Sequence, residues 1–216
     1  TYQGAQIIQT KEAFESMTDT IGVGTDVLND WSDAVGGTVS DLRLMTGFQT
    51  LAAGMSKEMT AAFAENNVQL LEISKAASAL NPALGDTAYM YESITRGIKR
   101  QSPLILDNLG IVVKIEEANR ALAESLGKSV EELTAEERQM ALLNEVLEKG
   151  DVLINQLGGS VDAATDPWDR FTTSTENAKN ALAQAAASSG VFTDALDETS
   201  TMLDVWTDRW ETQSVF

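Results

Sequence analysis

The sequence predicts an all-α protein, built as a multi-helix bundle or an extended helical array of short-to-medium amphipathic helices with no substantial β-sheet. The 216 residues contain only 3 prolines, whereas an all-β domain of this size would need more turn residues. Alanine, leucine, glutamate and methionine, which favour helix, are plentiful. Apolar residues recur at helical intervals, and the one strand-like run, residues 111–113, is too short to pair alone.

Prolines and capping boxes predict where helices begin. Each proline follows a residue type that commonly caps a helix, and proline is favoured at the first helical position, so we predict helices that begin at Pro82, Pro103 and Pro167. Two capping boxes, Ser129–Glu132 and Thr134–Glu137, mark further starts. Only one of them can begin a full helix, so the first box is predicted to form a short turn that leads into the second.

Glycines predict where helices end, because the residue after a helix often adopts the left-handed conformation. The predicted helix ends are at Gly22, Gly24, Gly36, Gly37, Gly110, Gly127, Gly150, Gly158 and Gly159. Short isolated helices are marginal in water. When it is free, the chain is therefore predicted to fold back into a bundle of about six to nine helices.

Three apolar stripes run through the chain with helical spacing. The first, with a polar residue at its third position, is Met59, Phe63, Asn66, Leu70, Ile73, Ala77 and Leu80. The second is Phe192, Leu196, Thr199, Leu203, Trp206 and Trp210. The third is Ile111, Ile115, Ala118, Leu122 and Leu126. We interpret these stripes as core faces packed within the same chain, with self-association through coiled-coil seams as the alternative.

The composition argues against most kinds of catalytic or binding site. The sequence has no cysteine and no histidine, which removes Ser-His and Cys-His nucleophile pairs and most zinc or haem sites. Residues 126–129 contain Gly-Lys-Ser but lack the earlier glycine of a phosphate loop. The glutamate pairs 131–132 and 136–137 fit the first turns of helices, where negative charge is favoured. We therefore predict no catalytic, cofactor-binding or metal-binding residue, no cofactor and no enzymatic activity.

Charge and hydropathy limit the partners. The net charge of −18 would repel nucleic acid phosphates, so no nucleic acid recognition is predicted. No apolar run is long enough for a transmembrane helix in this portion. One local exception to the acidic charge is formed by Arg96, Lys99 and Arg100. We interpret it as a solvated helix end, with an acidic neighbour in the same chain or on a partner as the alternative.

Tryptophans and the first residue give two further expectations. The four tryptophans are expected to be core anchors rather than binding platforms; they are Trp31, Trp168, Trp206 and Trp210. The chain begins at Thr1 without a signal-like segment. It is therefore expected to be a portion of a longer protein.

Several motifs resemble the tail tape measure proteins of tailed phages and prophages. They lie at residues 36–41 (Gly-Gly-Thr-Val-Ser-Asp), 94–113, 117–119 and 126–138. Their most specific stretch is Ser-Pro-Leu-Ile-Leu-Asp-Asn-Leu-Gly-Ile, within 94–113. Residues 1–150 are thus expected to be a helical region that matches this family. Residues 151–216 are expected to be an acidic, alanine-rich helical continuation, and both regions could form one continuous helical domain.

The resemblance implies a structural segment that helps to set tail length and templates tail tube assembly inside the tube lumen, with release at DNA ejection. It implies the tail tube protein, tail assembly chaperones and tail tip proteins as partners. The implied location is the tail tube lumen of the virion, and during assembly it is the host cytoplasm. As one helix, the chain would reach up to ~320 Å, and whether it is compact or extended in the tail stays open. The alternatives are a helical partner-binding or scaffolding module of another assembly and, third, a carboxylate-based hydrolase.

Overall fold

The computed structural model describes residues 2–158 and 167–188. Within these ranges the chain forms nine α-helices and one short 3₁₀ helix with no strand, which confirms the predicted all-α class. The elements are α1 (Tyr2–Ile21), α2 (Val27–Ala34), α3 (Asp41–Ala52), α4 (Lys57–Leu80), α5 (Thr87–Lys99), α6 (Pro103–Asp107), α7 (Ile115–Leu126), η1 (Val130–Glu132), α8 (Ala135–Gln156) and α9 (Pro167–Ser188). None of these helices combines the length and the apolar character needed to cross a bilayer.

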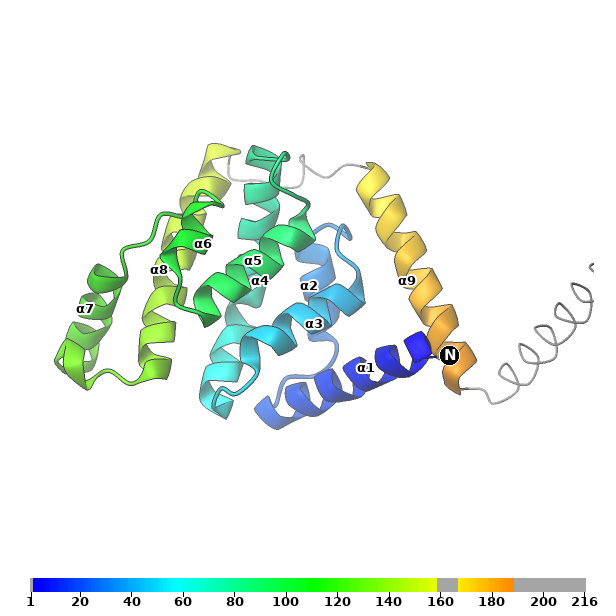
Figure 1. Ribbon diagram of the computed structural model, residues 1–216, viewed down its shortest axis with the longest axis horizontal. Coiled ribbons are helices and arrows are strands. Elements are labelled where there is room, and N and C mark those ends of the chain that lie inside the picture. Colours follow the sequence, from blue (N-terminus) through cyan, green and yellow to red (C-terminus); the bar gives the residue numbers. More distant parts are fainter. Residues whose placement is uncertain (1, 159–166, 189–216) are drawn as a thin grey trace, which may run out of the picture.

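Helix α4 is the central element of the array. It packs against α5 and α8 and also contacts α1, α2 and α3. Figure 1 shows α6, α7 and α8 at one end of the molecule and α1 and α9 at the other. Helix α7 packs mainly on α8, and α9 packs on α1 and α3. The core therefore lies around α4, whereas α7 and α9 form the two outer edges.

The first apolar stripe is a core face, as predicted. Its apolar members are all buried except Leu80, which is 40% exposed. The polar member Asn66 is half-buried, and its side-chain amide donates to the carbonyl of Ala62 (2.8 Å). Its neighbour Asn67 is instead fully buried, and the Oδ1 of Asn67 accepts a hydrogen bond from the Tyr91 hydroxyl (2.8 Å). The second stripe lies outside the described residues.

The aromatic part of the core joins α1, α2 and α3. Trp31, which is fully buried, has its ring centroid 5.6 Å from that of Phe14 and 4.9 Å from that of Phe48. Trp31 is therefore a core anchor, as predicted. The side chain of Trp168 and all of Trp206 and Trp210 lie outside the described residues.

Local helix signals mostly behave as predicted. Pro103 and Pro167 begin α6 and α9. Both capping boxes form: Ser129–Glu132 caps only the short η1, and Thr134–Glu137 caps α8. Gly127 adopts the left-handed conformation directly after α7. The other predicted end glycines with positive φ are Gly22, Gly36, Gly37, Gly110 and Gly158. Gly24 has no positive φ and lies in the loop between α1 and α2, and Gly159 lies outside the described residues.

The predicted helix start at Pro82 is wrong. Helix α4 ends at Leu80, and Pro82 lies in a turn closed by the hydrogen bond from Leu84 N–H to the Asn81 carbonyl (3.0 Å). Helix α5 begins later, at Thr87, because Asp86 supplies the cap: its carboxylate accepts from the Tyr89 N–H (2.7 Å). A proline after a capping-type residue is therefore compatible with a tight turn as well as with a helix start.

The predicted helix end at Gly150 is also wrong. Gly150 lies buried inside α8. A Cβ at this position would overlap Cδ1 and Cγ1 of Ile73 and lie 2.9 Å from Cγ2. The glycine thus permits close approach of α8 to α4 instead of ending a helix. Helix α8 runs through residue 150, so no helix ends at the predicted boundary between residues 1–150 and 151–216. The division of the chain into these two regions stays a prediction.

Candidate partner-binding groove

Several carboxylates serve as caps between or within helices. At the start of α4, the Ser56 N–H and hydroxyl both donate to the Glu136 carboxylate of α8, each at 2.7 Å. Glu137 accepts from the Thr134 N–H (2.7 Å) and pairs with Lys128. The first contact joins the N-terminal ends of α4 and α8, and the second joins α8 to the loop after α7.

The ionisation of these carboxylates follows from their partners. Hydrogen bonds from Ser56 hold the pKa of Glu136 below its usual value, and bonds from Ser129 do the same for Glu132. Lys128 and the Thr134 N–H lower the pKa of Glu137 to about 2. A general acid needs a raised pKa, so these groups have the opposite character and act as ionised acceptors.

We expect acid to destabilise the α7–α8 end of the molecule. Because the pKa of Glu137 is below its unfolded value of about 4.5, its stabilising contribution is present above pH ~4.5 and is lost as the pH falls toward about 2. Urea unfolding measured between pH 7 and pH 2 should show a smaller loss of stability for Glu137→Gln than for the unmodified chain. Glu65→Gln, on the exposed face of α4, is the control and should lose as much stability between pH 7 and pH 2 as the unmodified chain. Equal pH dependence in all three proteins would contradict this expectation.

Asp41, at the start of α3, is the described carboxyl group with a raised pKa. Partial burial raises it, and a hydrogen bond with Asn177 of α9 opposes the rise. Asp41 lines a cavity of about 200 Å³ between α1, α2, α3 and α9. The cavity lining contains no second carboxylate, and within the described residues no cluster of acidic side chains could hold a metal ion. This cavity therefore lacks the paired carboxylates of a glycosidase-type site.

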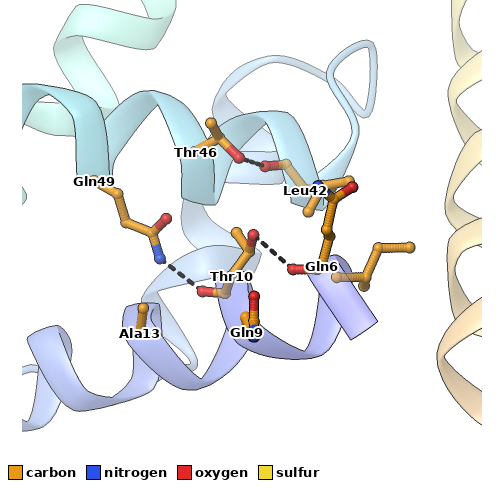
Figure 2. Close-up of a pocket in the computed structure, with 8 residues that line it drawn as sticks. Gln6, Gln9, Thr10, Ala13, Leu42, Thr46 and Gln49 are labelled. Atoms are coloured by element: carbon orange, nitrogen blue, oxygen red, sulfur yellow. Dashed lines mark hydrogen bonds between the residues drawn. The ribbon is translucent and has the colours of Figure 1, made fainter. Parts of the chain in front are cut away.

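A surface hollow of about 580 Å³ lies between α1 and α3 and is shown in Figure 2. Its polar side chains are amides and hydroxyls, and those of Thr10, Thr46 and Gln49 donate to backbone carbonyls. The Gln49 amide donates to the Thr10 carbonyl (2.6 Å), and the Thr10 hydroxyl donates to the Gln6 carbonyl (3.0 Å). The first bond joins α3 to α1, the second lies within α1, and the lining contains no charged side chain.

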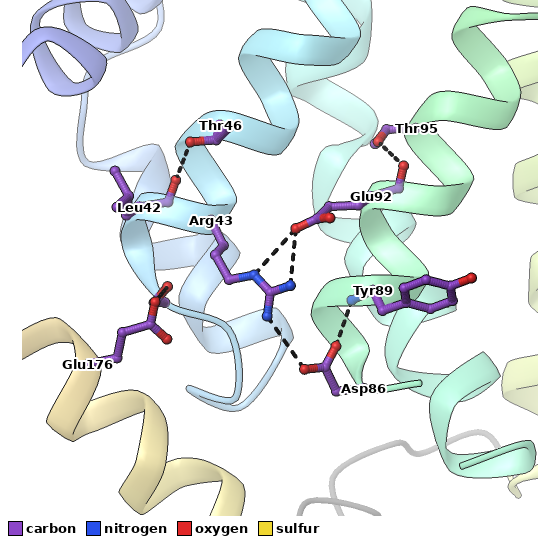
Figure 3. Close-up of polar contacts among 9 residues, drawn as sticks. Leu42, Arg43, Thr46, Asp86, Tyr89, Glu92, Thr95 and Glu176 are labelled. Atoms are coloured by element: carbon purple, nitrogen blue, oxygen red, sulfur yellow. Dashed lines mark hydrogen bonds and ion pairs between the residues drawn. The ribbon is translucent and has the colours of Figure 1, made fainter. Parts of the chain in front are cut away.

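Basic side chains also connect helices. Figure 3 shows Arg43 of α3 between two carboxylates of the α5 region: its Nη2 lies 3.2 Å from Glu92 and its Nη1 3.4 Å from Asp86. These half-exposed pairs contribute little stability in water. Lys99, in the predicted basic cluster, donates to the carbonyls of Thr50 and Ala53 at the end of α3. It therefore caps a neighbouring helix.

The two arginines of the basic cluster behave differently from Lys99. Both Arg96 and Arg100 are exposed at the end of α5, which agrees with the interpretation of a solvated helix end. Among the described residues no carboxylate forms an ion pair with either of them.

A groove of about 320 Å³ lies between the start of α4, the end of α7 and the start of α8. We call it the α7–α8 groove. Its apolar lining residues are Met59, Leu122, Leu126 and Met140, and its polar lining residues are Ser56, Glu58, Thr134, Glu136 and Glu137. Since α7 packs mainly on α8, the face of α7 toward α4 is incompletely covered, and Leu126 is 47% exposed.

The third apolar stripe indicates only part of this groove. Its members Leu122 and Leu126 line the groove, and Ala118 is buried. Ile111 precedes α7, which begins at Ile115, so the stripe does not lie on one helix. Met59 and Met140 could not be recognised as groove residues from the sequence, because the stripe does not indicate which helices α7 faces.

No protein-family model, no curated protein and no solved structure matches this chain.

Proposed function

We propose that this chain is a structural segment of a phage or prophage tail tape measure protein, which acts by length and packing and carries out no catalysis. The observation that carries the proposal is the motif in residues 94–113, which resembles that family. In the fold this stretch is structural: Pro103 begins α6, and Ile94, Ile98, Leu106 and Ile111 are buried. Packing accounts for these buried residues of the motif, whereas Leu104 and Val112 are exposed.

The fold suggests how such a segment would behave before and after tail assembly. The free chain forms a bundle, in which helices such as α2 and α6 gain stability from tertiary packing. In the tube lumen the helices would extend, and the tail tube protein would cover the apolar faces that the bundle buries. The net charge of −18 would disfavour adhesion to DNA in the same channel. Assembly chaperones and tail tip proteins are the further partners of this proposal, with the virion as its location.

Deletion in a phage whose tape measure carries this segment tests the proposal. Removal of residues 10–150 in frame should shorten the tail, by ~1.5 Å per deleted residue if the segment is helical and extended there. Electron microscopy of purified tails gives the length. A tail of unchanged length would contradict a ruler function. Shortening by much less per residue would indicate that the segment stays folded in the tail.

A length-preserving variant is the matched control. Trp31→Ala removes a core side chain but keeps the number of residues. A ruler counts residues, so the tails that assemble with this variant should have unchanged length.

The α7–α8 groove favours a second candidate function, a helical partner-binding or scaffolding module. Such a module should be a stable bundle with an exposed apolar groove, and the groove beside Leu126 has this character. The two candidates differ in whether the folded bundle or the extended chain is the working state.

A further inference from the structure

We propose that the α7–α8 groove binds an amphipathic helix of a partner protein, with aliphatic side chains on one face and lysine or arginine next to them. The inference rests on the second candidate function. It concerns the folded bundle, so it stands or fails separately from the ruler assignment that the tail-length experiment tests.

The apolar floor fits a helix face. Leu122 and Leu126, four residues apart on α7, line the groove together with Met59 of α4 and Met140 of α8. Methionine side chains are flexible and polarisable, so they adapt to the shape of a bound side chain. A cavity of about 320 Å³ lies at the lower end of the range for ligand pockets. It suits the anchoring side chains of a docked helix better than a large small-molecule ligand.

The rim of the groove determines the charge of the partner. Its charged lining residues are Glu58, Glu136 and Glu137. Bonds from Ser56 lower the pKa of Glu136, and the paired Lys128 together with the Thr134 N–H lowers the pKa of Glu137, so both carboxylates are held ionised. Glu58 is exposed in the first turn of α4, and no described side chain forms an ion pair with it. A cationic residue beside the apolar face of the incoming helix would complement this rim.

Charge also argues against other occupants. A second copy of the chain would bring another net charge of −18, and such charge keeps proteins apart. The chain's own residues 189–216 contain an apolar stripe, but Arg209 is their only basic residue among several acidic ones. A basic helix from another protein is therefore the occupant that the charges favour.

The methionines provide a direct test. With ¹³C-methyl methionine labels on the full chain, titration with an amphipathic leucine–lysine peptide should shift the methyl signals of Met59 and Met140. Met17 and Met55 line a different hollow, between α1 and the α3–α4 loop, and should not shift. A leucine–glutamate peptide of the same pattern should cause no shift. No shift at Met59 and Met140 with the leucine–lysine peptide, or equal shifts at all four methionines, would overturn the proposal.

Two variants separate groove binding from general attraction to an acidic protein. Glu58→Lys should weaken binding of the leucine–lysine peptide by about tenfold. Glu65→Lys, on the same helix but outside the groove lining, changes the net charge equally and should have a much smaller effect. Equal weakening by both variants would show that binding follows net charge, which would overturn the proposal.

A third variant tests the apolar floor. Leu126→Ser changes a side chain that is 47% exposed, so the fold should be retained, as circular dichroism can verify. It should weaken peptide binding by about tenfold through the lost apolar contact. Unchanged affinity for Leu126→Ser would likewise overturn the proposal.

Discussion

Replacement of Gly150 by leucine is expected to destabilise the bundle by about 3 kcal/mol or more, because the new side chain has no room between α8 and α4. Gly150 is buried, and even a Cβ there would overlap the side chain of Ile73, which is itself fully buried. The higher helix propensity of leucine offsets less than ~1 kcal/mol of this loss. Urea unfolding followed by circular dichroism measures the change.

A double-mutant cycle shows whether this contact is the cause. Gly150→Ala and Ile73→Ala should each destabilise, the second by ~2–5 kcal/mol through a cavity. The double variant should lose less stability than the sum of the two single losses, since the added methyl group enters the space that Ile73 leaves. Glu148→Ala, on the exposed side of the same helix, is the control and should stay within ~0.5 kcal/mol. Strict additivity of the two core substitutions would contradict the close approach of α8 to α4.

The second large effect is expected at Trp31. Trp31→Ala should lower the free energy of unfolding by ~3–5 kcal/mol, since it empties a fully buried site. It also removes ring contacts with Phe14 and Phe48, which join α1 and α3 to α2. Differential scanning calorimetry and urea unfolding give the loss.

Trp31→Phe distinguishes ring packing from polar bonding at this site. Trp31 Nε1 is buried without a hydrogen-bond acceptor among the described residues, so loss of the N–H should cost little. We expect Trp31→Phe to lose less than half as much stability as Trp31→Ala. A phenylalanine variant as unstable as the alanine variant would show that the indole N–H has a role that the ring contacts do not explain.

The capping contacts also bear on the proposed extension in the tail. Glu136 caps α4 from α8, Glu176 of α9 accepts from the Ser40 hydroxyl (3.1 Å) at the start of α3, and Lys99 caps the end of α3. Extension of the chain would break these contacts together with the apolar core. Under our proposal, tube subunits that replace the core contacts would therefore have to offset this loss.

Local rules predicted much of this fold from the sequence. The capping boxes at Ser129 and Thr134 and the left-handed Gly127 are where they were predicted. Each depends on hydrogen bonds or backbone conformations within a few residues of one another, so neighbouring residue types suffice to predict them. The spacing of Met59, Phe63 and Leu70 likewise identifies a buried face, because burial follows helical periodicity.

The candidate site and the wrong prediction at Gly150 depend on contacts far apart in the sequence, whereas the wrong prediction at Pro82 concerns a local turn. Gly150 faces Ile73, Glu136 caps Ser56, and the buried amide is Asn67 rather than Asn66, because Tyr91 lies opposite it. The sequence by itself determined the helical class and several helix boundaries, such as the starts of α6, α8 and α9 and the end of α7, because propensity and capping act over one or two turns. Only the tertiary structure decided which helices touch, which glycine permits a close crossing and where α7 leaves a groove open, because packing depends on distant side chains that fill the same space.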